Sequence, residues 1–226
     1  MAKRNAKESL IALLRGVEHF NTHIFPEKQE LFRELAEGQT PSTLFIACAD
    51  SRVSPGLITQ TDPGNLFILR NIGNIVPAYG EMLGGVSSAI EYAVAGLGVS
   101  NIIVCGHSNC GAMTALLDPD PSKLAKMPTV QSWLRNAEAA RAVTLAGSDA
   151  GPPTVRNLAE QNVLLQISHL RTHPSVAAAL ARNELTLQGW FYDIGTGEVL
   201  VLDEQARKTI SIEDAIAQLE KSGVPA

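Results

Sequence analysis

The stretch Cys48-Ala49-Asp50-Ser51-Arg52 places a thiol, a carboxylate and a guanidinium close together in the chain. It follows the apolar run 44–47, which has the length and composition of a buried strand. In open α/β sheets, ligands bind at the carboxyl ends of strands. A soft metal ligand, a hydrogen-bond acceptor and a fixed positive charge at such a position indicate a functional site.

A second stretch, residues 106–111 with the sequence GHSNCG, follows another predicted strand at 101–105. His107 and Cys110 are three residues apart, so in the first turn of a helix they share one face. If the two strands are parallel neighbours, Cys48 meets this pair at one edge of the sheet. Two cysteines and one histidine are typical zinc ligands, and three protein ligands leave an open position, as catalytic zinc sites do.

Asp50 has two candidate roles next to such a metal. It could be a fourth zinc ligand that closes the site, or it could accept a hydrogen bond from a zinc-bound water. In the second case Arg52 would keep the carboxylate off the metal. Residues two apart in an extended segment point the same way, so the two can form a bidentate pair that holds the carboxylate ionised.

Other interpretations of these motifs are less favourable. The glycine spacing of 106–111 is that of a phosphate loop, but Ala112 and Met113 replace the required Lys and Ser/Thr. The same stretch lacks the final glycine of a nucleophile elbow, and the chain has no Cys-x-x-Cys motif. Cysteines can also be small buried hydrophobes, which is the reading that we adopt for Cys105 in the middle of a strand.

Two histidine pairs, His19/His23 and His169/His173, have the i,i+4 spacing of metal ligands on a helix. Neither pair has a third ligand nearby in the sequence, so we expect surface or capping roles. His173 precedes Pro174 at a predicted helix end, where a positive charge suits the helix dipole.

Composition narrows the class of protein. The chain has 226 residues, 45% of them hydrophobic and 18% charged, with a net charge of −5, as expected for one globular domain. The sequence has no stripe of basic residues, so we do not expect nucleic acid as a partner. Three cysteines, an odd number, favour a reducing compartment over disulfides. Because we find no signal peptide pattern and no apolar run of membrane-spanning length, we expect a cytoplasmic location without a membrane partner.

Strands and helices alternate along the chain. The patterns predict strands at 44–47, 65–70 and 101–105, and a hairpin-like pair at 185–192 and 198–202. Turn chemistry is expected at 53–56 and a surface connection at 118–128. Helices are predicted at 7–20, 26–37, 83–98, 112–117, 130–145, 154–171, 175–182 and 212–220. This order predicts an α/β fold with a mostly parallel central sheet flanked by helices. We expect a single domain, 1–226, with an N-terminal helical arm at 1–38.

The combined pattern, CxDxR at 48–52 with HxxCG at 107–111, resembles that of the β-class carbonic anhydrases, and the likeness covers most of the chain. The resemblance implies reversible hydration of carbon dioxide to bicarbonate and a proton by a zinc-bound hydroxide. It implies that Asp50 and Arg52 form a catalytic dyad that orients this hydroxide. One Zn²⁺ per subunit would be held by Cys48, His107 and Cys110.

The resemblance also has implications for the pocket and for assembly. It implies homodimers or homotetramers whose pockets lie at subunit interfaces, with carbon dioxide and bicarbonate as small-molecule partners. Some family members have an inhibitory bicarbonate site built on a tryptophan, where this chain has Phe45. Although Arg70 and Tyr192 resemble the rest of that site, we expect Phe45 to be strand core and the site not to operate. Substrate-binding residues implied by the resemblance are Gln39, Phe67, Tyr92 and Gly111.

Two alternative functions are compatible with the same motifs. The first is a hydrolase of a carbon dioxide analogue, such as carbonyl sulfide or carbon disulfide, on the same scaffold. The second is a non-catalytic, zinc-stabilised assembly protein. The second would not need Asp50 or Arg52, and both are present.

The ligand set predicts how activity depends on pH. Zinc lowers the pKa of bound water to about 7 with three neutral histidines, and two thiolates donate more negative charge to the metal. The water should therefore be less acidic, and the rate of carbon dioxide hydration should rise toward alkaline pH. Stopped-flow measurement over about pH 6.5 to 9 tests this expectation, and a flat profile would contradict it.

Overall fold

The computed structural model describes residues 5–147 and 151–221. The chain divides into two compact units, Met1–Gln39 and Thr40–Ala226.

The first unit is mostly helical in its described part. It begins with α1 (Ala6–His19), where Asn5 and Glu8 form a reciprocal capping box. A π-helical turn, Phe20–Ile24, continues α1 into α2 (Phe25–Glu27), which is followed by α3 (Gln29–Glu37). The predicted helices at 7–20 and 26–37 are present, but helical turns bridge the gap that was expected between them. Phe20, Phe25 and Phe32 pack together, with ring centroids 5.3–6.1 Å apart.

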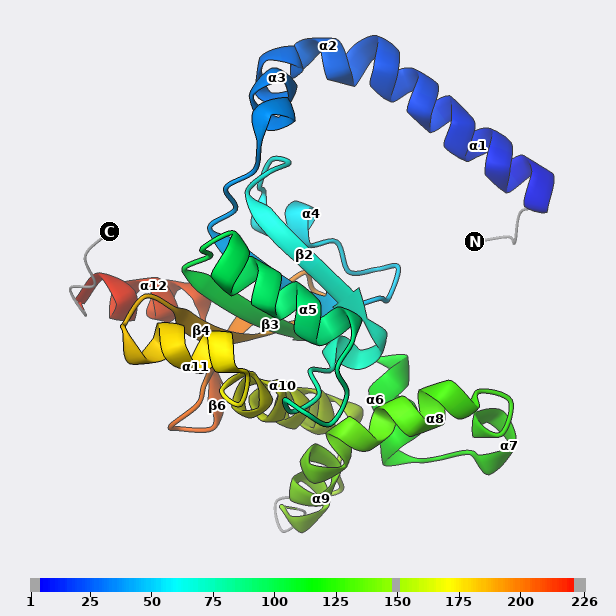
Figure 1. The fold of residues 1–226 in the computed structure, drawn as a ribbon. Helices are drawn as coiled ribbons and strands as arrows, with labels where there is room; N and C mark the ends of the chain where they lie inside the picture. Colours follow the sequence, from blue (N-terminus) through cyan, green and yellow to red (C-terminus); the bar gives the residue numbers. More distant parts are fainter. Residues whose placement is uncertain (1–4, 148–150, 222–226) are drawn as a thin grey trace. The chain divides into compact units, whose positions relative to one another are not determined.

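The second unit is built on a six-stranded sheet in the order β2-β1-β3-β4-β5-β6 (Figure 1). The first four strands along the chain pair in parallel, and β5 and β6 are antiparallel. The prediction of a mostly parallel sheet is therefore confirmed. The strands are β1 (Thr43–Cys48), β2 (Leu66–Asn71), β3 (Asn101–His107), β4 (Thr186–Tyr192), β5 (Val199–Asp203) and β6 (Lys208–Ile210).

The helices of the second unit follow the predicted order with several additions. The expected turn at 53–56 runs into a short helix that begins at Pro55, and the expected connection at 118–128 contains another that begins at Pro121. Proline suits the first turn of a helix because its missing N–H needs no partner there. No helix within the described residues is long and apolar enough to cross a membrane. The helices are α4 (Pro55–Thr59), α5 (Gly85–Glu91), α6 (Gly111–Leu117), α7 (Pro121–Leu124), α8 (Pro128–Leu134), α9 (Glu138–Ala146), α10 (Val155–Leu170), α11 (Pro174–Ala181) and α12 (Ile212–Lys221).

The core lies on both faces of the sheet, because successive residues of β1 point to opposite sides. Leu44, Ile46 and Cys48 join a large cluster with buried residues of α5, α6, α10 and α11. Phe45 and Ala47 join a smaller cluster on the other face. All six residues of β1 are buried, which explains the unbroken apolar run that marked this strand in the sequence.

Helix α10 packs closely on the sheet because two adjacent strands present glycines to it. A Cβ added to Gly106 of β3 would lie 2.8 Å from Val163 Cγ2. A Cβ added to Gly189 of β4 would lie 2.8 Å from Val163 Cγ1. The buried Val163 therefore occupies the space left by both missing side chains.

Buried polar groups of α10 fix the loop that follows β2. Asn162 Nδ2 donates to the Gly73 carbonyl at 3.0 Å, and Gln166 Nε2 donates to Asn162 Oδ1 at 2.7 Å. Gln166 Oε1 in turn accepts from the Val76 N–H at 2.8 Å. Both amide side chains are fully buried, so these bonds satisfy groups that would otherwise cost free energy.

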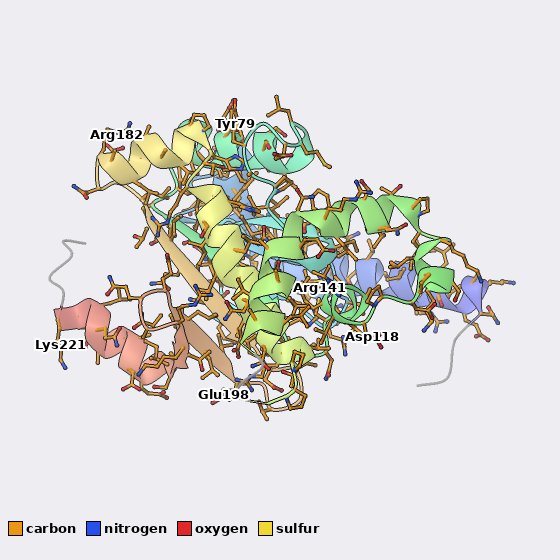
Figure 2. All side chains as sticks on the ribbon, turned by 90° about the horizontal axis from the view of Figure 1, so that it is seen from below. Tyr79, Asp118, Arg141, Arg182, Glu198 and Lys221 are labelled. Carbon is orange, nitrogen blue, oxygen red and sulfur yellow. The ribbon has the colours of Figure 1, made fainter. Side chains whose placement is uncertain are left out.

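Two histidines also contact the loop that follows β2. His169 Nδ1 lies 2.7 Å from the Val76 carbonyl, and the buried His173 places Nε2 3.1 Å from the Pro77 carbonyl. The rings of Tyr79, which is labelled in Figure 2, and His173 pack edge to face. The expected surface or capping role of His173 is wrong, since the residue is buried at the N-cap position of α11 and its side chain makes no capping bond. Burial lowers its pKa. The hydrogen bond of His173 to the distant Pro77 carbonyl, and not the dipole of the preceding helix, determines where this side chain lies.

The close approach of α10 gives a prediction for stability. Gly106→Ala should lower the free energy of unfolding by about 1–3 kcal/mol, because the new methyl overlaps Val163. Val163→Ala opens that space, so the double variant should be less destabilised than the sum of the two single variants. Urea unfolding of all four proteins measures the coupling, and strictly additive effects would contradict this packing.

Candidate metal centre

Three donor atoms meet at the carboxyl edge of the sheet. Cys48 ends β1, His107 ends β3, and their strands pair in parallel with Ala47 opposite Cys105. Cys110 is the N-cap residue of α6. One side-chain donor atom from each of Cys48, His107 and Cys110 lies within 4.8 Å of the other two.

The local geometry of the second stretch differs from the expected one. His107 and Cys110 were predicted to share a face in the first turn of a helix, whereas His107 lies in the strand and the helix begins at Gly111. The two are brought together by a tight turn in which Asn109 has a φ of 53°. Asparagine tolerates this left-handed conformation better than most residues.

His107 presents an unpartnered nitrogen to this cluster. Its Nδ1 lies 2.8 Å from the Ser108 carbonyl, which can only accept, so the ring proton is on Nδ1. Nε2 is therefore an acceptor, and it is buried without a hydrogen-bond partner. A metal-binding histidine typically has this arrangement, with one nitrogen donating to a carbonyl and the other free.

The pKa values of the two thiols are shifted in opposite directions. The hydrogen bond from Cys110 lowers the pKa of Cys48 to about 4, although burial opposes this effect. The same bond, together with burial, raises the pKa of Cys110. Cys105 lies apart from the pair, and burial alone raises its pKa to about 12. One thiolate therefore forms readily in the cluster, as a zinc ligand requires.

A backbone amide supports the Cys48 sulfur. The N–H of Gly73 donates to Cys48 Sγ at 3.4 Å. Gly73 has a φ of +75°, and an added Cβ would lie 3.0 Å from Ala112 Cβ. A side chain at this position would be both strained and crowded, so glycine is needed to aim the amide at the sulfur.

Asp50 and Arg52 form the expected bidentate pair. Arg52 Nε donates to Asp50 Oδ1 at 2.9 Å, and Arg52 Nη2 donates to Asp50 Oδ2 at 2.7 Å. These bonds from Arg52 hold the pKa of Asp50 well below its usual range. Arg52 Nη2 also donates to the Asn109 carbonyl at 3.1 Å. Asp50 Oδ2 lies 4.0 Å from His107 Nε2, beside the donor cluster.

Arg70 fixes the backbone of the same stretch. Its Nε donates to the Cys48 carbonyl at 3.0 Å, and its Nη2 donates to the Asp50 carbonyl at 2.5 Å. Phe45 is fully buried and packs edge-on against Trp190, so the expectation that it is strand core is confirmed.

The other predicted site residues are distributed differently. Phe67 and Tyr92 contact each other, with ring centroids 5.9 Å apart. Asn71, not Phe67, is the strand partner of Cys48, so Phe67 lies about 13 Å farther back along β2. Gly111 directly follows Cys110 at the start of α6. Gln39 belongs to the first unit, and its predicted contact with substrate stays a prediction.

An apolar pocket that sequence reasoning missed borders the donor-bearing segments. Ala49 and Ile72 line it together with Met82, Val130 and Trp133. The indole N–H of Trp133 donates to the Ile72 carbonyl at 2.8 Å. This bond joins residues 61 positions apart, so no local sequence pattern predicts it.

The donor set fits a zinc ion. Two sulfur donors and one nitrogen donor are typical zinc ligands, and the three atoms lie within 4.8 Å of one another, near enough for one ion to reach all of them. The unpartnered, buried Nε2 of His107 supports the same conclusion, because a metal would satisfy it.

Comparisons with known proteins agree on one family. Residues 43–199 match the family model described as carbonic anhydrase. A carbonic anhydrase of Pseudomonas aeruginosa is 47% identical over 203 residues, which are 89% of this chain and 91% of that protein. One of Synechococcus elongatus is 40% identical over 213 residues, or 93% of this chain and 78% of that protein.

Solved structures give the same result. The β-carbonic anhydrase CcaA superposes with a TM-score of 0.86 at 40% identity, covering 90% of this chain and 99% of its own. A structure from a study of two tetrameric β-carbonic anhydrases of Sordaria macrospora has a TM-score of 0.76 at 31% identity. That match covers 86% of this chain and 97% of the other.

The cluster predicts which cysteines retain metal. Cys48→Ser should lose most of the bound zinc, because an alcohol replaces a thiolate ligand. Cys105→Ser is the matched control, since Cys105 packs in the smaller cluster on the opposite face of the sheet. Metal analysis after purification measures both, and equal zinc contents would contradict the assignment.

Proposed function

This chain belongs to the β-class carbonic anhydrase family, and from that membership we propose that it catalyses the reversible hydration of carbon dioxide to bicarbonate and a proton. Cys48, His107 and Cys110 would hold one Zn²⁺ per subunit. The observation that carries the proposal is the position of Asp50, which lies beside these donors yet is bound through both oxygens to Arg52.

When bound by these three residues, zinc would supply a Lewis acid that lowers the pKa of water and so makes it a better nucleophile. The chain supplies the surroundings in which this chemistry can occur. Three ligands leave the fourth position open, and Arg52 keeps the Asp50 carboxylate from occupying it. The ionised Asp50 can accept a hydrogen bond from the reacting water and so orient its lone pair toward carbon dioxide.

Carbon dioxide is small and apolar, so it needs apolar surroundings with few polar contacts. The pocket lined by Ala49 and Ile72 offers such a surface next to the ligand Cys48. Phe67 and Tyr92 are too far along the sheet to line the site of their own chain. We infer that they act in the site of a second copy, in a homodimer or homotetramer. The tetrameric state named for the Sordaria macrospora proteins supports assembly of this kind.

Other aspects of the proposal depend on composition and family. We infer that residues 1–226 act as one family domain with an N-terminal arm at 1–38, and that the protein works in the cytoplasm as a zinc lyase. Three free cysteines suit that reducing compartment. Neither a carbon disulfide or carbonyl sulfide hydrolase nor a non-catalytic assembly protein is favoured, because the matching relatives are named carbonic anhydrases.

Stopped-flow hydration of carbon dioxide by the zinc-loaded protein tests the function. Asp50→Asn keeps the shape of the side chain but removes its charge and the bidentate partner of Arg52. We expect kcat/KM to fall by about 100-fold while zinc content stays the same.

Asp120→Asn is the control, since this aspartate caps α7 and pairs with Lys123 and supplies no metal donor. It should leave the hydration rate unchanged. A wild-type protein that binds zinc but shows no hydration at about pH 8.5 would refute the function, because the alkaline range favours it. An unchanged rate in Asp50→Asn would refute the role of the carboxylate alone.

A further inference from the structure

The peptide group between Ile72 and Gly73 is hydrogen-bonded at both of its polar ends. Its N–H donates to Cys48 Sγ at 3.4 Å, and its carbonyl accepts from the indole N–H of Trp133 at 2.8 Å. The three groups form one chain of hydrogen bonds, which runs from the indole N–H through the peptide group to the sulfur. Hydrogen bonds in such a chain polarise one another.

The next peptide group is held by a different helix, α10. Its carbonyl, that of Gly73, accepts from the fully buried Asn162 at 3.0 Å. Asn162 fixes where Gly73 lies, but its bond is to a different peptide from the one that faces Cys48. Trp133 is therefore the side chain that bears directly on the amide at the sulfur.

We propose that Trp133 is a positioning residue for the Cys48 thiolate, acting through the Ile72–Gly73 peptide. By binding the carbonyl end, its indole N–H aims the Gly73 amide at Sγ and makes that amide a stronger donor. The stronger donor withdraws electron density from the sulfur, and the bound metal becomes a stronger Lewis acid. The last step rests on the proposed zinc site, whereas the hydrogen-bond chain exists in the protein alone.

Trp133 lies far from the ligands in sequence and supplies no metal donor. It comes from α8, whereas Cys48 and His107 come from strands and Cys110 from the start of α6. Partners outside the ligand shell commonly set the basicity and orientation of the ligands themselves. Here the partner acts on a sulfur ligand through one intervening peptide.

The chain offers a matched pair of variants. Trp133→Phe keeps an aromatic ring in the apolar pocket but removes the N–H. Trp133→His restores a ring N–H at the same distance from the backbone. Trp190→Phe removes the other indole N–H of the chain, which donates to Gln188 Oε1 at 3.0 Å and packs on the opposite face of the sheet.

The first measurement is hydrogen exchange of the Gly73 amide by NMR, on reduced protein without metal. Trp133→Phe should accelerate this exchange about threefold to tenfold, because its hydrogen bond to sulfur weakens. Trp133→His should restore the rate, and Trp190→Phe should leave it unchanged. If Trp133→Phe does not fold, the benzothienyl isostere of tryptophan at position 133 fills the same volume without an N–H.

The second measurement is the sulfur-to-metal charge-transfer band of the cobalt-substituted protein. Loss of the indole N–H should move this band to longer wavelength, because a more electron-rich sulfur gives up an electron more easily. An unchanged exchange rate or an unmoved band in Trp133→Phe overturns the proposal. So does a Trp133→His variant that behaves like Trp133→Phe, since lost ring volume would then be the cause. Wild-type protein that binds no cobalt would instead refute the metal site, while the exchange measurement would still stand.

Discussion

Parallel pairing of β1 with β3 holds Cys48 and His107 at one edge of the sheet, and the rest of the site is arranged around that edge. The two strands are buried and hydrogen-bonded along their length, so a slip of one residue would exchange the side chains that the two core clusters receive. The short turn after His107 then brings Cys110 to the same place. Rigid strands thus fix two donors, and a helix N-terminus fixes the third.

The loop after β2 is the second support of the site, and its position depends on helices from the later half of the chain. Asn162, Gln166 and His169 of α10 bind three of its backbone groups, and Trp133 of α8 binds another. Because Asn162 and Gln166 are fully buried, breaking their bonds would leave polar groups without water. The Gly73 amide is consequently held against Cys48 by packing that extends through the whole second unit.

The sequence predicted those parts of the site that follow from local pattern and simple topology. The run before Cys48 reads as a buried strand, and carboxyl ends of neighbouring parallel strands must meet, so the donor cluster could be expected. The short elements α4, α7 and β6 were missed because a few residues carry too little periodicity to detect. Contacts such as Trp133 with Ile72 and His173 with Pro77 join residues 61 and 96 positions apart, and only the folded chain reveals them.

The state of Asp50 is tied to the same framework as the donors. Arg52 is held by the Asn109 carbonyl in the turn between His107 and Cys110, and Arg70 holds the carbonyls of Cys48 and Asp50. For Asp50 to turn onto a metal, two charge-assisted hydrogen bonds to Arg52 would have to break while the backbone stayed fixed. The arrangement therefore favours an open fourth position, which is the state that hydration of carbon dioxide requires.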